Sequence, residues 1–137
     1  MAIVPTETSI PQTRPDALLE EVAREKSRVV VLFASELLGN GPDELGRVLI
    51  RSFVKTLNEV WPKPWRVVLI NSGVQLALDG SPVLGDLAAL EETGVDLLAC
   101  GTCLDYFKAR DRLRAGRVSN MLEIVATLMS ADRVVRP

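Results

Sequence analysis

The sequence predicts an α/β fold in which helices cover both faces of a mostly parallel sheet of about five strands. Apolar, β-branched runs of strand length alternate along the chain with segments of helical spacing. The runs are nearly continuous rather than alternating in polarity, which is typical of strands covered on both faces in a parallel sheet. No hairpin signal joins two of them, so we expect right-handed crossovers between the strands.

An N-terminal extension precedes the expected domain. The first 15 residues hold three prolines among threonine and serine, which indicates an extended or mobile tail. Residues 16–27 predict either a short helix capped by Asp16 or a linker. We therefore divide the chain into a tail with a short helix or linker over residues 1–27 and one α/β domain over residues 28–137.

Five apolar runs are expected to form the strands. The first, RVVVLFA, is the most continuous, and the last two are short. The expected strands are 28–34, 66–70, 95–99, 116–118 and 132–135.

The segments between these runs have helical periodicity. Pro62 and Pro64 end the first of them, and Ser81 followed by Pro82 predicts an N-cap and first helical residue. Ser119 or Asn120 is expected to cap the last helix. The expected helical segments are 43–61, 74–78, 82–94, 104–113 and 122–129.

Composition excludes several classes of function. The 137 residues are 47% hydrophobic with a net charge of −2, so neither nucleic acid nor an anionic membrane is an expected partner. No apolar run reaches the length of a membrane span, and the first 15 residues lack the features of a secretory signal. The chain has no histidine, which excludes Ser-His-Asp and Cys-His catalysis and histidine-bound metals. We expect a cytoplasmic protein without a cofactor.

The two cysteines of the chain, Cys100 and Cys103, form a CxxC motif at the end of the third expected strand. A helix is expected to begin at or just after Cys103, where unpaired N–H groups and the helix dipole favour a thiolate. A thiol pKa in such a place falls to about 3.5–7.5. Two other interpretations remain open: inert buried cysteines, or half of a zinc site that carboxylates or a second chain would complete.

Polar residues follow each of four expected strands. Carboxyl ends of parallel strands lie at one edge of a sheet, where ligands bind at the point of reversed strand order. These residues are therefore candidate binding residues, although plain turns explain them as well. The candidates are Gly39, Asn40, Gly41, Asn71, Ser72, Gly73, Gly101, Thr102, Ser119 and Asn120.

A basic cluster follows the CxxC motif, and the nearby Asp105 and Asp111 offset part of its charge. It would stabilise a nearby thiolate or dock an acidic partner, or it is an ordinary solvated face. Its members are Lys108, Arg110, Arg112, Arg114 and Arg117.

Five spaced blocks together resemble the DsrE/DsrF-like family of sulfur-handling proteins. They are most similar to the DsrE-like domain of YedF-type proteins, described as sulfurtransferase-like and linked to selenium metabolism. Three of the blocks are NSGV, CGTCLD and GRVSNM, and several spaced blocks in one order are far more specific than the CxxC motif alone. The blocks lie at 31–41, 43–46, 71–74, 100–105 and 116–121.

The resemblance implies a flavodoxin-like α/β/α domain, often a homo-oligomer, with a persulfide on a strand-end cysteine. Cys100 matches that position, and Cys103 would be a resolving or second acceptor thiol. Gly101 is expected to leave space for the incoming sulfur. YedF-type proteins usually carry a TusA-like domain ahead of this one. Because residues 1–27 are too short for it, we expect a TusA-like donor or acceptor partner, or a protein that works without one.

Two alternatives to a sulfur or selenium carrier stay open. One is a non-catalytic, oligomeric binding module with structural cysteines, whose thiols react slowly with alkylating reagents at neutral pH. The weaker one is a thioredoxin-like oxidoreductase, which needs a disulfide between Cys100 and Cys103 and a reductase.

Overall fold

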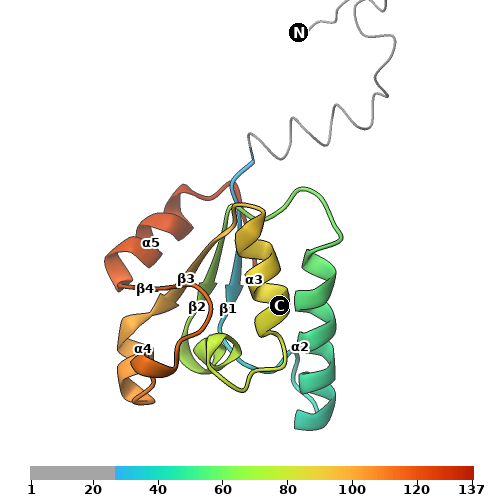
Figure 1. The fold of residues 1–137 in the computed structure, drawn as a ribbon. Coiled ribbons are helices and arrows are strands. Elements are labelled where there is room, and N and C mark those ends of the chain that lie inside the picture. Colours follow the sequence, from blue (N-terminus) through green and yellow to red (C-terminus); the bar gives the residue numbers. More distant parts are fainter. Residues whose placement is uncertain (1–26) are drawn as a thin grey trace, which may run out of the picture.

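Five parallel strands form one sheet in the order β4-β3-β2-β1-β5 (Figure 1). The structure is a computed structural model and describes residues 27–137. The tail and short helix expected ahead of residue 27 lie outside the described residues. The strands are β1 (Val29–Phe33), β2 (Arg66–Leu69), β3 (Asp96–Cys100), β4 (Arg117–Ser119) and β5 (Arg133–Val135).

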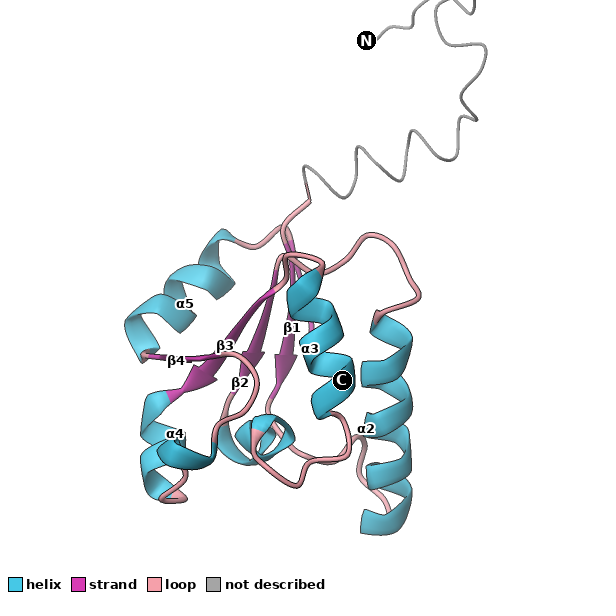
Figure 2. Cartoon of the chain, viewed as in Figure 1, coloured by secondary structure: helices cyan, strands magenta, loops and turns pink. Residues whose placement is uncertain are grey.

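Helices cover both faces of the sheet, as the sequence predicts. The steps from β1 to β4 all run in one direction, so right-handed crossovers place their connections on one face. The chain then returns to the far side of β1, which places α5 on the opposite face. Figure 2 shows α2 and α3 on one side of the strands and α5 on the other. The helices are α2 (Asp43–Leu57), α3 (Leu84–Glu92), α4 (Gly101–Tyr106) and α5 (Met121–Ser130), with 3-10 segments η2 (Asn71–Ala77) and η3 (Arg110–Arg112).

The core lies between the central strands and the α2–α3 layer. The middle residues of β2 and β3, among them Val68 and Leu98, are fully buried. Phe33 at the end of β1 meets Phe53 of α2 edge to face, with ring centroids 5.8 Å apart. Burial on both faces explains why β2 and β3 are apolar at every position after their first residues, Arg66 and Asp96.

The segment after the CxxC motif differs from its prediction. The expected helix over 104–113 is instead α4, which begins at Gly101 and ends at Tyr106, followed by the separate turn η3. Lys108 takes a left-handed conformation (φ 54°), its N–H donates to the Asp105 carbonyl, and the Ala109 N–H donates to the Leu104 carbonyl. This is a Schellman ending with lysine where glycine is usual, so the sequence carried no signal of the helix end.

Three other predicted segments have different limits. The helix expected over 43–61 is α2, which ends at Leu57. The helix expected from Pro82 begins at Leu84, although the Ser81 hydroxyl oxygen still accepts a hydrogen bond from the Val83 N–H at 3.2 Å. The helical piece expected at 74–78 is η2, which begins at Asn71. The polar residues after β2 are therefore part of a 3-10 segment.

The direction of the chain through the sheet reverses at β4, so the connections that leave the neighbouring strands β3 and β4 lie on opposite faces. Cys100 is the last residue of β3, and Cys103 lies in the helix that follows it. The CxxC motif therefore lies beside the reversal of strand order, where the sequence predicts a ligand site. Within residues 27–137, no helix combines the length and apolar character needed to cross a bilayer.

Candidate functional site

The end of β3 and the first turn of α4 place the two cysteines in contact. Cys100 is the last residue of β3, pairs in register with Ser119 of β4, and is only 1% exposed. Cys103 is the third residue of α4 and is half-buried. Both are free thiols. The first cysteine thus belongs to the sheet, whereas the second lies outside it.

A backbone N–H group lies directly against the outer thiol. The Asn71 N–H donates to Cys103 Sγ, with a nitrogen–sulfur distance of 3.0 Å. Asn71 has a left-handed conformation (φ 53°), and its side-chain oxygen accepts from the Ser72 N–H at 2.8 Å. Asparagine tolerates this conformation because its short side chain bonds locally to the backbone. The start of η2 therefore presents a donor that stabilises negative charge on the Cys103 sulfur.

Other surroundings of this thiol act in the opposite direction. Burial raises the pKa of Cys103 above its ordinary value, and the hydrogen bond with Cys100 raises it further. The Asn71 N–H lowers the pKa but does not compensate. The depressed pKa expected from the start of a helix is therefore wrong for Cys103. The cause is that burial of Cys103 and its contact with the Cys100 thiol disfavour the thiolate more than the Asn71 N–H favours it.

A hollow of about 360 Å³ opens beside Cys103. Asn71, Thr102, Tyr106 and Phe107 form the rest of its lining. Tyr106 is 81% exposed, and its ring meets that of Phe107 edge to face at 5.2 Å between centroids. Cys103 is therefore the thiol that a visiting group reaches, and Cys100 lies behind it.

Gly101 lies close to β4 and to the Arg110 side chain. A β-carbon on Gly101 would lie 2.9 Å from Arg110 Nη2 and 3.0 Å from the Ser119 carbonyl oxygen. Arg110 is held there by an ion pair with Asp105 at 2.5 Å. The absence of a side chain at Gly101 therefore allows α4 to pack closely against β4, and the role expected for it in sulfur loading stays a prediction.

The remaining candidate residues have structural partners away from the hollow. The Ser72 hydroxyl oxygen accepts from the Glu36 N–H at 3.2 Å, and the Ser119 hydroxyl donates to Glu123 at 2.5 Å. The Asn120 side chain caps α5 by accepting from the Glu123 N–H at 2.9 Å. Gly73 is buried against β1. Gly39, Asn40 and Gly41 line a smaller hollow of about 180 Å³ with residues of α2.

Only Asn71 and Thr102 of the predicted binding residues therefore share the hollow with Cys103. Tyr106 and Phe107 were not predicted as part of the site. Their spacing of three and four residues after Cys103 places them on the same face of a helix, which is the signal that would have identified them.

Arginines of the basic cluster are paired with carboxylates. Arg112 and Arg114 reach Asp79 at 2.8 and 3.7 Å, and Arg117 reaches both Asp96 and Glu123 at 2.9 and 2.6 Å. With Arg110 held by Asp105, Lys108 is the one member of the basic cluster without an ion pair among residues 27–137. Among residues 27–137, no group of three or more carboxylate or cysteine side chains is placed to hold a metal ion.

Comparison with solved structures defines the class of fold. The YchN protein from E. coli superimposes with a TM-score of 0.62 at 17% identity, covering 81% of this chain and 99% of its own. The protein of unknown function MTH1491 from Methanobacterium thermoautotrophicum superimposes with a TM-score of 0.59 at 24% identity, covering 82% of this chain and 100% of its own. No protein-family model and no curated protein matches the sequence.

Both solved proteins share the fold of this chain over about four fifths of its length. The chain is therefore an α/β protein of flavodoxin-like architecture, as the sequence predicts. At these identities the comparison describes the fold alone. The chemistry of the thiols must be argued from this chain's own residues.

Proposed function

We propose that this protein carries sulfur as a persulfide on the CxxC motif, with Cys103 as the thiol that receives it. One observation supports this most directly: the Cys103 sulfur lines an open hollow and accepts a hydrogen bond from a backbone N–H. A thiolate needs both access to its target and a donor that stabilises its charge. Cys103 has both, whereas Cys100 is buried.

The transfer step involves no net oxidation. The Cys103 thiolate attacks the outer sulfur of a donor persulfide R–S–SH, a new S–S bond forms, and the donor thiolate R–S⁻ leaves. Cys103 then holds the added sulfur as Cys–S–SH. In the reverse sense, an acceptor thiolate attacks that outer sulfur and Cys103 leaves as the thiolate. The Asn71 N–H stabilises the Cys103 thiolate before loading and after transfer.

In this proposal Cys100 does not carry the sulfur but influences the protonation of Cys103. Its hydrogen bond with Cys103 keeps the outer thiol protonated in the resting protein, because it raises the pKa of Cys103. The family resemblance instead implies Cys100 as the persulfide carrier. Loading of single-cysteine variants distinguishes the two assignments, because each predicts that a different variant retains the added sulfur.

The donor or acceptor is proposed to be a small sulfur-carrier protein, such as a TusA-like protein. Tyr106 projects beside Cys103 and is largely exposed, so a partner's cysteine would approach past an aromatic side chain. Selenium follows the same nucleophilic route as sulfur. Competition between labelled sulfide- and selenide-derived donors would assign the element.

A second copy of the chain is proposed to cover α5. This helix is apolar around most of its circumference, and Leu122 and Met129 on its outer side are 82% and 81% exposed. Helices that are apolar all round are normally buried. Two-fold pairing would bury the same face of both copies, which is the commonest symmetry of soluble oligomers.

The binding module with structural cysteines remains the alternative, and the raised pKa of Cys103 favours it. A thiol whose pKa is raised is almost entirely protonated near neutral pH and reacts slowly. Both proposals therefore predict slow alkylation of the resting protein at neutral pH. They differ in whether a persulfide donor loads Cys103.

The experiment is intact-mass analysis after incubation with cysteine persulfide, followed by removal of the donor. The carrier proposal predicts the added mass of one sulfur atom in the parent protein and in Cys100→Ala, and its loss in Cys103→Ala. Addition that survives in Cys103→Ala but not in Cys100→Ala would assign Cys100. No addition to the parent protein would favour the binding module.

A further inference from the structure

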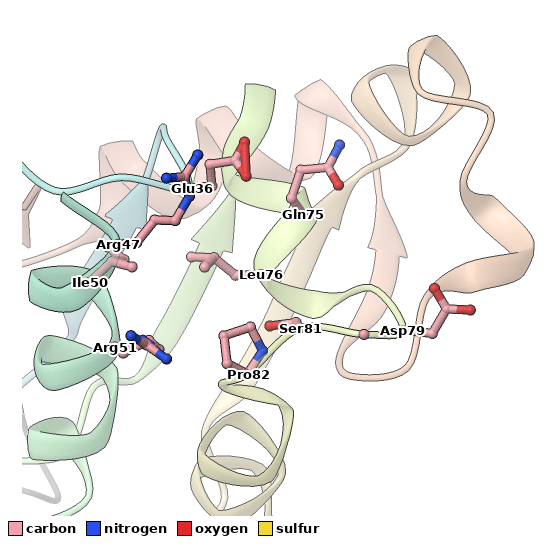
Figure 3. Close-up of a pocket in the computed structure, with 10 residues that line it drawn as sticks. Glu36, Arg47, Ile50, Arg51, Gln75, Leu76, Asp79, Ser81 and Pro82 are labelled. Carbon is pink, nitrogen blue, oxygen red and sulfur yellow. The ribbon is translucent and has the colours of Figure 1, made fainter. Parts of the chain in front are cut away.

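A second cavity lies on the α2–α3 side of the molecule, and it shares no residue with the hollow beside Cys103. It has a volume of about 370 Å³, which is within the range of small-molecule sites. Residues of α2, of η2 and of the loop before α3 surround it (Figure 3). The proposed sulfur chemistry makes no use of this cavity.

Two arginines of α2 border the cavity on one side. Arg47 and Arg51 are one helical turn apart and so share a face of the helix. Figure 3 shows both on the α2 side, with Ser81 and Pro82 on the opposite side. Within the part of the chain that the structure describes, neither guanidinium has a carboxylate within ion-pair distance. Like charges in this spacing destabilise a helix slightly, and a bound anion would remove that cost.

The opposite wall and the floor suit the rest of a small ligand. Ile50 and Leu76 are 3% and 4% exposed and form an apolar floor. The Ser81 hydroxyl oxygen already accepts from the Val83 N–H, which leaves its O–H free to donate. Gln75 has no side-chain partner among the described residues and adds an amide donor at the rim.

Two carboxylates oppose the arginines. Asp79 is neutralised by Arg112 at 2.8 Å and Arg114 at 3.7 Å, and Figure 3 shows it directed away from Arg51. Glu36 lines the cavity without an ion pair among the described residues. Glu36 therefore lowers the affinity for a purely anionic ligand. Its carboxylate oxygens can accept hydrogen bonds from a ligand that also carries a donor.

From this arrangement we infer that the cavity binds a small molecule that carries a phosphate or carboxylate on an apolar body. Arg47 and Arg51 bind the anionic group, because guanidinium groups form charge-assisted hydrogen bonds with phosphates and with carboxylates. The apolar body lies on Ile50 and Leu76. Cys103 plays no part in this binding, so the inference is independent of the sulfur-carrier proposal.

The test is titration of the ¹⁵N-labelled full chain with phenyl phosphate and with benzoate, followed by NMR. We expect saturable shifts of the Arg47 and Arg51 side-chain N–H signals and of the Gln75 side-chain amide. Inorganic phosphate, which lacks the apolar body, should bind more weakly. The tighter of the two organic probes identifies the preferred anionic group.

Variants of the lining residues test whether the probes bind in this cavity. Arg47→Met and Arg51→Met should each weaken binding of the tighter probe about tenfold, which is the loss in affinity expected when one charge-assisted hydrogen bond is removed. Glu36→Gln should strengthen binding of the same probe several-fold, because the substitution removes a negative charge that repels the anionic group. Arg136→Met removes an exposed arginine beyond β5 and should leave the affinity unchanged.

The inference is overturned by the absence of saturable shifts with both organic probes, or by equal weakening in Arg136→Met and Arg51→Met. Cys103→Ala should bind as the parent does. A loss of binding there would place the ligand at the thiol instead.

Discussion

Gly73 is the residue on which the geometry of η2 most depends, and its replacement by alanine tests that dependence. A β-carbon on Gly73 would collide with the Phe33 carbonyl oxygen and lie 2.9 Å from the carbonyl carbon. That carbonyl cannot move away freely, because it accepts from the Ile70 N–H at 3.0 Å, beside the ladder between β1 and β2. Alanine at this position must therefore shift η2, and with it Asn71.

The expected cost is that of severe overpacking. Overpacked core substitutions cost about 1–3 kcal/mol, and a contact with fixed backbone belongs at or above the upper end. We expect Gly73→Ala to lower the free energy of unfolding by about 3 kcal/mol and the melting temperature by roughly 10 °C. Displacement of Asn71 also removes the N–H from Cys103 Sγ, so the pKa of Cys103 should rise further.

Urea unfolding and calorimetry measure the stability, and the pH dependence of alkylation measures the pKa. Gly85→Ala is the matched control, because Gly85 lies in α3 with open space around its missing β-carbon. Alanine there should stabilise the protein by up to about 1 kcal/mol. A melting temperature of Gly73→Ala equal to that of the parent would refute the packing argument.

Three further predictions concern α5. Asn120→Ala removes its N-cap and should cost about 1 kcal/mol in urea unfolding, whereas Asn120→Ser should retain most of that stability. Arg117 and then Ser119 hold the pKa of Glu123 at about 2, so its contribution to stability is present above its unfolded pKa and is lost as pH falls from about 5 to about 2. Glu123→Gln should flatten this part of the stability–pH curve, and equal slopes in both proteins would contradict the assignment. Leu122→Glu should lower the sedimentation coefficient toward that of a monomer, because it places a charge in the proposed contact between two copies of α5. A parent protein that already sediments as a monomer would contradict this prediction.

The order and type of most elements followed from the sequence for a simple physical reason. Strands buried on both faces must be apolar at nearly every position, so the runs that became β1, β2 and β3 were visible. The helix end at Lys108 was not, because lysine in a left-handed conformation follows from tertiary packing rather than from a local preference.

The candidate site was predictable in its parts but not in its arrangement. The CxxC spacing identified the thiols, and the parallel sheet placed Asn71 at the same edge as Cys103. Which cysteine is accessible depends on the single step from strand to helix at residues 100 and 101. A helix that begins three residues earlier than expected turns Cys100 into the interior. The same shift places Tyr106 and Phe107 beside the outer thiol.

Loading of the thiols by a persulfide donor tests the central claim most directly. After incubation with cysteine persulfide, the mass of one added sulfur atom should map to the peptide that contains Cys103 in Cys100→Ala. The loading rate should rise about tenfold per pH unit near neutrality, because the pKa of Cys103 is raised and only the thiolate reacts. Loading that is absent, or that persists unchanged in Cys103→Ala, would contradict the account.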